Sequence, residues 1–184
     1  METLRAWRKG VQRRRGMRLS GPGPAMSPLS WIGEERIAIG GLPPIGSVAC
    51  LAGQGVTHIV NCRARVQVRV SGDLAAEWTA FGPDRVAHAP MWDFGWRQRP
   101  QLWADAVCFA ARALAEDPQA RVLIHCSAGR RRSAMLCYAV LRLRGRAAGE
   151  AASLVLNYRR EAELVPAYVH SVEQWLARAS ARVP

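Results

Sequence analysis

The residues best suited to chemistry in this chain lie in one run of twelve, VLIHCSAGRRRS, from Val122 to Ser133. An apolar stretch ends at His125 and Cys126, a loop of small and basic residues follows, and an apolar pattern typical of a helix begins after Ser133. The backbone N–H groups of such a loop bind an oxyanion, and the dipole of the following helix adds to the positive field. The same field lowers the pKa of a thiol at the loop entrance, and the thiolate is the nucleophilic form. The run therefore predicts a phosphate-sized anion site beside a nucleophilic sulfur.

Each residue of the run has an expected role. Arg132 follows Cys126 by six residues, so its guanidinium can fold back over the loop and bind two phosphate oxygens at once. Gly129 permits the tight turn, Ser133 can hydrogen-bond the sulfur, and His125 can hold the loop through local carbonyls without touching substrate. The expected phosphate-binding loop consists of Ser127, Ala128, Gly129, Arg130 and Arg131.

The run resembles the signature His-Cys-x2-Gly-x2-Arg-Ser/Thr of the cysteine-dependent protein tyrosine phosphatase superfamily, and the short chain resembles its dual-specificity branch. By this resemblance Cys126 is the nucleophile, Arg132 clamps the phosphate and Ser133 assists departure of the sulfur. The resemblance implies a phosphoprotein phosphatase that acts on phosphotyrosine, and also on phosphoserine or phosphothreonine, through a phosphocysteine intermediate. It implies neither a metal nor a cofactor.

Phosphoryl transfer to sulfur also needs a proton donor for the leaving oxygen, and a carboxylic acid can supply it. Three other aspartates have structural explanations. Asp105 lies within a helical pattern, Asp84 lies in a Gly-Pro-Asp sequence typical of a turn, and Asp73 is placed to cap a helix. Asp93 lies in the segment MWDFGW, after an expected strand and before an expected helix, and Gly95 permits motion there. In the resembled family the acid lies some thirty residues before the cysteine. Asp93 is therefore the expected general acid.

Other readings stay open. If Arg130 and Arg131 face the pocket, a phosphoinositide or an RNA 5′ phosphate becomes the expected substrate. A non-catalytic phosphate-binding module is a further alternative. Sulfur transfer and arsenate reduction fit less well, because the first needs no general acid and the second usually needs a resolving thiol, for which Cys137 is the candidate. More arginines are expected at the rim of the site: Arg63, Arg65, Arg69, Arg159 and Arg160.

Composition limits the class of protein, its cellular compartment and its partners. The 184 residues suffice for one globular domain, and no apolar run is long enough to span a membrane. Five scattered cysteines without a Cys-x2-Cys pair favour a reducing cytoplasm over a disulfide framework or a zinc site. The net charge of +12 suits an anionic partner, a phosphorylated protein or another phosphate ester. Contact with nucleic acid or an anionic membrane has weaker support, because the sequence contains no recognised nucleic-acid module.

The first part of the chain has the character of a tail. Residues 1–30 are basic and rich in glycine and proline, and they are expected to be disordered, with an anionic-surface anchor as the alternative. Translation from Met26 instead of Met1 would remove most of this segment. Residues 31–184 are the expected catalytic domain.

The expected domain is α/β, with a mostly parallel central sheet flanked by helices and the site at the carboxyl ends of the strands. Strands are expected over residues 36–39, 56–61, 85–89 and 122–125. Helices are expected over 45–52, 74–81, 102–114, the segment after the loop, 147–158 and 166–179, and the polar segment 63–72 is expected to be a loop.

Overall fold

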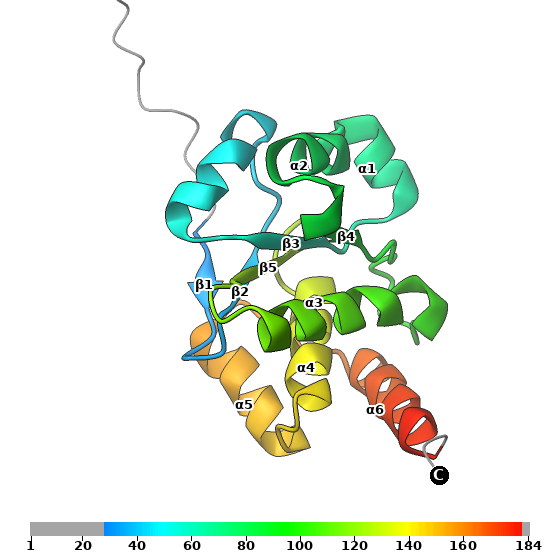
Figure 1. Ribbon diagram of the computed structural model, residues 1–184. Helices are drawn as coiled ribbons and strands as arrows, with labels where there is room; N and C mark the ends of the chain where they lie inside the picture. Colours follow the sequence, from blue (N-terminus) through cyan, green and yellow to red (C-terminus); the bar gives the residue numbers. More distant parts are fainter. Residues whose placement is uncertain (1–27, 182–184) are drawn as a thin grey trace, which may run out of the picture.

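The computed structural model describes residues 28–181 of the chain. Its centre is a five-stranded sheet (Figure 1). The strands are β1 (Ser30–Trp31), β2 (Ile37–Gly40), β3 (His58–Asn61), β4 (Val86–His88) and β5 (Val122–His125). They follow the order β1-β2-β5-β3-β4, in which only β1 and β2 pair antiparallel. The expectation of one α/β domain with a mostly parallel sheet is confirmed.

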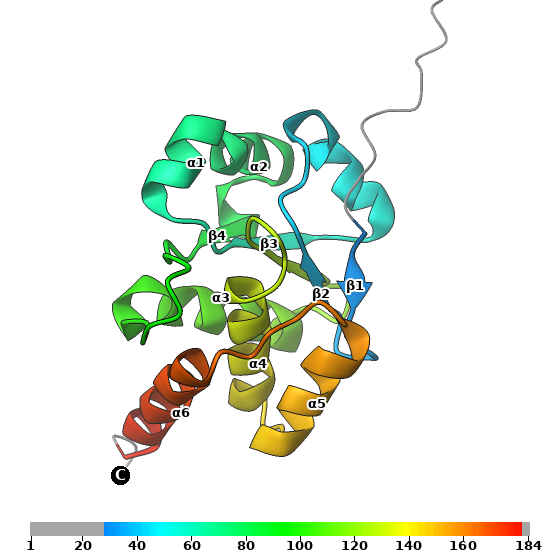
Figure 2. The same ribbon diagram turned by 180° about the vertical axis from the view of Figure 1, so that it is seen from behind.

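Helices cover both faces of this sheet (Figures 1 and 2). One layer holds the 3₁₀ helix η1 (Ile45–Gln54), α1 (Arg65–Ser71) and α2 (Asp73–Phe81). The other layer holds α3 (Ala104–Glu116), α4 (Arg132–Leu143), α5 (Ala148–Tyr158) and α6 (Pro166–Ser180). Two short 3₁₀ turns, η2 (Pro83–Arg85) and η3 (Pro100–Leu102), precede β4 and α3. Within the described part of the chain, no helix is long and apolar enough to cross a membrane.

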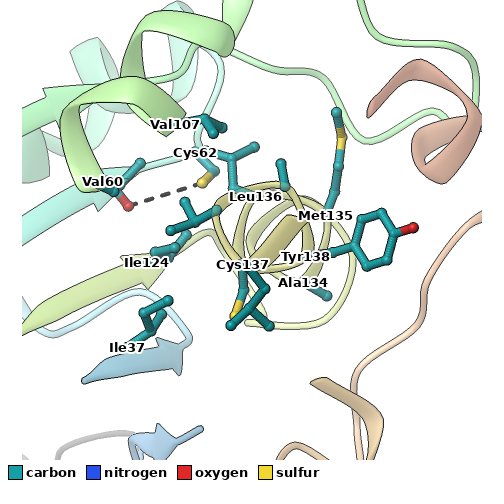
Figure 3. Close-up of a cluster of buried hydrophobic side chains, with 14 of the residues drawn as sticks. Ile37, Val60, Cys62, Val107, Ile124, Ala134, Met135, Leu136, Cys137 and Tyr138 are labelled. Carbon is teal, nitrogen blue, oxygen red and sulfur yellow. Dashed lines mark hydrogen bonds between the residues drawn. The ribbon is translucent and has the colours of Figure 1, made fainter. Parts of the chain in front are cut away.

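The alternation of side chains along the strands divides the core in two. In β5, Val122 and Ile124 join the cluster under α3 to α6, whereas Leu123 points to the opposite cluster under η1, α1 and α2. Every residue of β5 is buried, as expected for a central parallel strand. Figure 3 shows α4 nearly end-on, with Val60 and Ile124 of neighbouring strands directed toward it. Since β5 and α4 are both deeply buried, the loop between them is anchored at its two ends.

One expected element was wrong. Residues 65–71 form the helix α1 and not part of a polar loop. The RVQVRV pattern lacks helical periodicity. Contacts with the core and at both ends of the segment stabilise the helix instead. Val68 is buried in the core, Gln67 Oε1 accepts the N–H of Ala64, and Gly72 closes the helix in the left-handed conformation.

The other expected helices and strands are present with shifted ends. The helix expected from residue 102 begins at Ala104, after the η3 turn, and the strand expected from residue 56 begins at His58. Strand β1 pairs Ser30 with Ile39 at the edge of the sheet and had not been expected. The disordered tail was predicted over residues 1–30. Its last residue, Ser30, lies in β1, whereas residues 1–27 lie outside the described residues, and for them the tail stays a prediction.

Candidate active site

The site forms at the carboxyl end of β5, where His125 lies opposite Gly40 on one side and Asn61 on the other. The chain then turns through residues 126–131 and enters α4 at Arg132. Gly129 makes the turn with a φ of +68°, and a Cβ there would meet the carbonyl group of Gly40 at 2.6 Å. Only glycine fits this position without displacing the backbone.

Four successive carbonyl groups of the loop are held on its outer side. The carbonyl of Ser127 accepts the N–H of Leu42 at 3.1 Å, and that of Arg130 accepts the N–H of Glu163 at 3.0 Å. Between them, the carbonyls of Ala128 and Gly129 accept the buried Arg159 guanidinium at 3.4 and 3.1 Å. A trans peptide directs its N–H opposite to its carbonyl. The N–H groups of residues 128–131 are therefore turned toward the centre of the loop, which makes a nest for an anion.

The Cys126 thiol lies at the bottom of this nest. Its Sγ is 3.2 Å from the Gly129 nitrogen and 3.4 Å from the Ser133 hydroxyl. Burial alone would raise the pKa of Cys126, but hydrogen bonds from the Ser133 hydroxyl and from backbone N–H groups, with the nearby Arg132 charge, lower it below its usual range. By contrast, burial raises the pKa of Cys62 and Cys137. Environment therefore lowers the pKa of Cys126 and raises that of the two other buried thiols.

Arg132 lies over the loop, as expected from its spacing, and is almost wholly buried. Its NH1 group donates to Gln67 Oε1 at 2.9 Å and to the Met91 carbonyl at 3.1 Å, and NH2 donates to the Ser127 hydroxyl at 3.1 Å. These bonds hold the guanidinium plane in place. Its Nε has no hydrogen-bond partner among the described residues and is thus left as a donor for an anion in the loop.

Asp93 reaches the same place from the segment between β4 and α3. Its Oδ2 is 3.7 Å from Arg132 Nε, and its Oδ1 accepts the Tyr168 hydroxyl at 3.1 Å. That hydroxyl in turn accepts the N–H of Gly95 at 3.1 Å, so α6 fixes the segment that carries the carboxylate. The structure thus brings Asp93, Arg132 and Cys126 together at one loop. Asp73, Asp84 and Asp105 lie elsewhere: in the network described next, in the η2 turn and in the first turn of α3.

A buried polar network supports the loop from the side of α2. His125 Nε2 lies 2.8 Å from Glu77 Oε1. The ring therefore contacts a carboxylate, whereas local carbonyls had been expected to hold it. The Asn61 amide donates to both Glu77 and Asp73. Arg63 pairs with Asp73 at 2.7 Å and donates from Nε to the Ser127 hydroxyl at 3.3 Å. This network ties α2 and β3 to the loop.

The arginines expected at the rim divide into a buried and an exposed group. Arg63 and Arg159 are buried and brace the loop, so they do not line the rim. Arg131 pairs with Glu163 at 2.7 Å, and Arg130 lies 4.0 Å from the same carboxylate and donates to the Glu161 carbonyl. Further cations are exposed at the surface: Arg65, Arg69 and Arg160. Among residues 28–181, no cluster of three or more His, Cys, Asp or Glu side chains could hold a metal ion.

Sequence reasoning missed several residues that brace the site. Gln67 was hidden in the segment expected to be a loop, and the packing role of α6 concealed Tyr168, which points from that helix to Asp93. Asn61 and Glu77 each carried a weak signal, a polar residue at the end of an apolar strand and an acid within a helix whose neighbours are apolar. Only their meeting in space reveals that they form one network.

Comparison with known proteins shows which solved structures share this fold. No family model matches the sequence, and no curated protein matches it. Solved structures match across most of their lengths. The kinase associated phosphatase KAP, with its catalytic-site cysteine replaced by serine, has a TM-score of 0.71 at 16% identity, over 86% of this chain and 99% of that one.

Two more matches have the same character. Human DUSP28 has a TM-score of 0.66 at 21% identity, over 85% of this chain and 98% of its own. PTPMT1 in complex with PI(5)P has a TM-score of 0.67 at 20% identity, over 80% of this chain and 94% of its own. The likeness is one of fold, and it confirms the fold that the resemblance of the loop had implied.

Proposed function

We propose that this protein hydrolyses phosphate monoesters through a phosphocysteine intermediate, with Cys126 as the nucleophile. The observation that carries the proposal is the nest of inward N–H groups around Cys126, a thiol whose pKa is lowered while those of Cys62 and Cys137 are raised. A phosphate-binding module without turnover has no need of a stabilised thiolate. Cys137 is buried with a raised pKa and does not suit a resolving thiol, which disfavours arsenate reduction.

The first half of the proposed reaction moves the phosphoryl group to sulfur. The loop N–H groups and Arg132 Nε hold the phosphate oxygens, so that phosphorus lies in line with the Cys126 thiolate. The S–P bond forms as the bond from phosphorus to the ester oxygen breaks. Asp93, in its protonated form, gives its proton to that oxygen, and the alcohol or phenol leaves. Arg132 stabilises the charge on the equatorial oxygens during transfer.

The second half returns the enzyme to its starting state. The Asp93 carboxylate accepts a proton from a water molecule, and the oxygen of that water attacks phosphorus. The S–P bond breaks, and the electron pair returns to Cys126. The Ser133 hydroxyl, 3.4 Å from Sγ, donates a hydrogen bond to the departing thiolate. Inorganic phosphate then leaves the loop.

The leading substrate class is the phosphorylated protein, with phosphotyrosine first and phosphoserine or phosphothreonine in addition. The pairing of Arg130 and Arg131 with Glu163 offsets part of their charge, which favours an ester with a single phosphate at the loop. Since the reaction needs a reduced thiol, we further propose that the protein works in the reducing cytoplasm.

A phosphoinositide is the second candidate substrate. It is supported by the likeness in fold to PTPMT1, whose structure holds PI(5)P, and by the two exposed arginines of the loop. Replacing both with glutamine separates the candidates. A loss confined to substrates with several phosphates supports the phosphoinositide, whereas an equal effect on phosphotyrosine peptides supports the protein.

The experiment that tests the proposed chemistry is steady-state hydrolysis of para-nitrophenyl phosphate in reducing buffer with EDTA. Wild type should turn over, and Cys126→Ser should be inactive. The variant Asp93→Asn should lose roughly 10²- to 10⁴-fold in kcat, the usual contribution of a general acid. The aspartate Asp105 provides a matched control, because Asp105→Asn should leave the rate unchanged. Folded wild type without turnover on this ester and on phosphotyrosine peptides would falsify the proposal.

A further inference from the structure

Three aromatic side chains lie exposed on the segment that carries Asp93. In the aromatic loop, residues 92–97, Trp92, Phe94 and Trp96 are 46%, 61% and 74% exposed. Their rings form a continuous series, with centroids 5.4 Å apart for the first pair and 5.7 Å for the second. Large apolar side chains gathered in this way at a surface commonly mark an interaction site.

The aromatic loop is held in this outward arrangement by bonds on its inner side. The buried Gln98 donates from Nε2 to the carbonyls of Trp92 and Trp96, and its own N–H donates to the Ser171 hydroxyl. Gly95 donates its N–H to the Tyr168 hydroxyl. These backbone groups have hydrogen-bond partners within the protein. The rings can therefore enter an apolar phase without leaving these groups unpaired.

Helix α1 presents a second apolar strip near the site. Val66 and Val70 are 50% and 83% exposed, next to Gln67 on the same short helix. The guanidinium of Arg132 bonds both Gln67 and the carbonyl of Met91, which immediately precedes the aromatic loop. The two apolar strips therefore lie on elements that meet at Arg132, and Figure 2 shows α1 and the segment that joins β4 to α3 on the same side of the molecule.

Cations are interspersed with these apolar side chains. Arg65 and Arg69 lie exposed on α1, and Arg97 and Arg99 lie exposed in and just after the aromatic loop. Arg130 and Arg131 lie in the loop after Cys126, next to Glu163. Indole and phenyl rings next to arginines are typical of surfaces that rest in the interface of a bilayer, where rings reach the acyl boundary and cations meet anionic headgroups. We propose that the surface around the site, made of the aromatic loop, α1 and these arginines, docks on anionic lipid bilayers.

Charge and shape favour a bilayer over a protein partner. The apolar strips lie on two separate elements that both contact Arg132, so a broad surface that offers both lipid and phosphate satisfies them together. The chain carries a net charge of +12, of which residues 1–19 contribute seven basic groups and one acid, and the whole molecule is thus attracted to anionic lipid. The inference rests on the proposed function and deepens it: the phosphate monoester, whether it is carried by a protein or by a lipid, is presented at the surface of a membrane.

The test is co-sedimentation of the full chain with phosphatidylcholine vesicles, with and without about one third phosphatidylserine. Wild type should bind the anionic vesicles, and added salt should weaken binding because the attraction is screened. The double variant Trp96→Ser/Val70→Ser removes one apolar group from each flank and should lower the partition coefficient by about tenfold or more. The matched control is Trp78→Ser, which removes a 45% exposed indole from α2 and should bind as wild type.

Three results would overturn the inference. The first is equal binding by wild type and the double variant. The second is binding that depends only on the tail, abolished by replacing Arg13, Arg14 and Arg15 with glutamine and indifferent to Trp96 and Val70. The third is a raised KM of the double variant for a soluble phosphopeptide with unchanged vesicle binding, which would make the surface a protein docking site.

Activity assays separate this inference from the proposed chemistry. On para-nitrophenyl phosphate the double variant should match wild type, since neither side chain touches the thiol, Arg132 or Asp93. On a phosphatidylinositol phosphate held in anionic vesicles it should lose about tenfold in rate, following its lost binding. If wild type hydrolyses no phosphate ester at all, the proposed function fails, and the vesicle experiment still decides whether this surface docks on lipid.

Discussion

At the scale of single residues, the site depends on how the pKa of a buried thiol is lowered. Burial opposes the charge on Cys126, and only directed donors overcome it: the Ser133 hydroxyl, the loop N–H groups and Arg132. Cys62, with comparable burial, shows the outcome without such donors, a pKa well above the usual range. Hydrogen bonds and the Arg132 charge lower the pKa of Cys126, whereas burial and the nearby Cys126 and Glu77 raise that of Cys62.

This balance predicts a pH profile. Alkylation of Cys126 by iodoacetamide should rise with pH through a midpoint below that of an ordinary thiol, because the folded protein favours the thiolate. The variant Ser133→Ala removes a donor and should move the midpoint upward. Measuring inactivation rates across pH checks both statements. A midpoint for wild type at or above that of a free cysteine would contradict them.

The same hydroxyl has a kinetic signature. Without Ser133 the thiolate leaves phosphorus less readily, so Ser133→Ala should slow hydrolysis of the intermediate by about tenfold or more and leave its formation less affected. Stopped-flow traces should then show a burst of para-nitrophenol before a slow steady state. Equal slowing of both phases would place the hydroxyl in the first step instead.

At the scale of elements, the loop is shaped by what holds its carbonyls. Gly129 packs against Gly40 on β2, so Gly129→Ala must displace one backbone or the other. We expect this variant to fold, to bind phosphate or vanadate more weakly and to lose activity by about 10²-fold or more, because the inward N–H groups lose their common centre. Circular dichroism and vanadate inhibition would check it. The matched change Gly46→Ala meets open space and should be silent.

Arg159 joins α5 to this loop and provides a second prediction at the same scale. Its guanidinium bonds the carbonyls of Ala128 and Gly129, and also Pro28 and Ser30 near the edge strand. Arg159→Met keeps the length and loses all four bonds. We expect a lower kcat by about tenfold or more and a lower melting temperature, since buried carbonyls lose their partners. The neighbouring exposed residue provides the control, and Arg160→Met should change neither quantity.

The sequence predicted those elements whose conformation depends on local patterns, and it missed those that depend on distant parts of the chain. Strand β5, the loop and α4 carry periodic and local signals, and they were predicted closely. Helix α1 was not, because its turn is fixed by the burial of Val68 and the capping by Gln67 and Gly72, which depend on distant parts of the chain. The orientation of Arg130 and Arg131 likewise depended on Glu163, over thirty residues away.

At the scale of the whole molecule, a buried ionic network joins the helical layer of α2 to the site. Burial alone would raise the pKa of Asp73, but hydrogen bonds from Ser71, Asn61 and Arg63 hold it below its usual range. The unfolded chain therefore binds this proton more tightly than the folded protein, and stability is lost as pH falls through the folded pKa. Asp73→Asn should weaken this dependence and lower stability at neutral pH, because Arg63 loses its partner.

Urea unfolding at neutral and acid pH would measure this linkage. Wild type should lose stability on acidification below about pH 4, the ordinary pKa of an aspartate, more steeply than the variant. The exposed Asp105 again supplies the control, since Asp105→Asn should track wild type. If Asp73→Asn and wild type fall in parallel, the network contributes nothing to acid stability.

The central claim is that phosphate passes through the sulfur of Cys126. Rapid acid quench of the protein during turnover of para-nitrophenyl phosphate, followed by peptide mass spectrometry, tests it directly. We predict one added phosphoryl group on the peptide that contains Cys126, more abundant in Ser133→Ala and absent in Cys126→Ser. A protein that turns over with no phosphoryl group on that peptide, in wild type and in Ser133→Ala alike, would contradict the account.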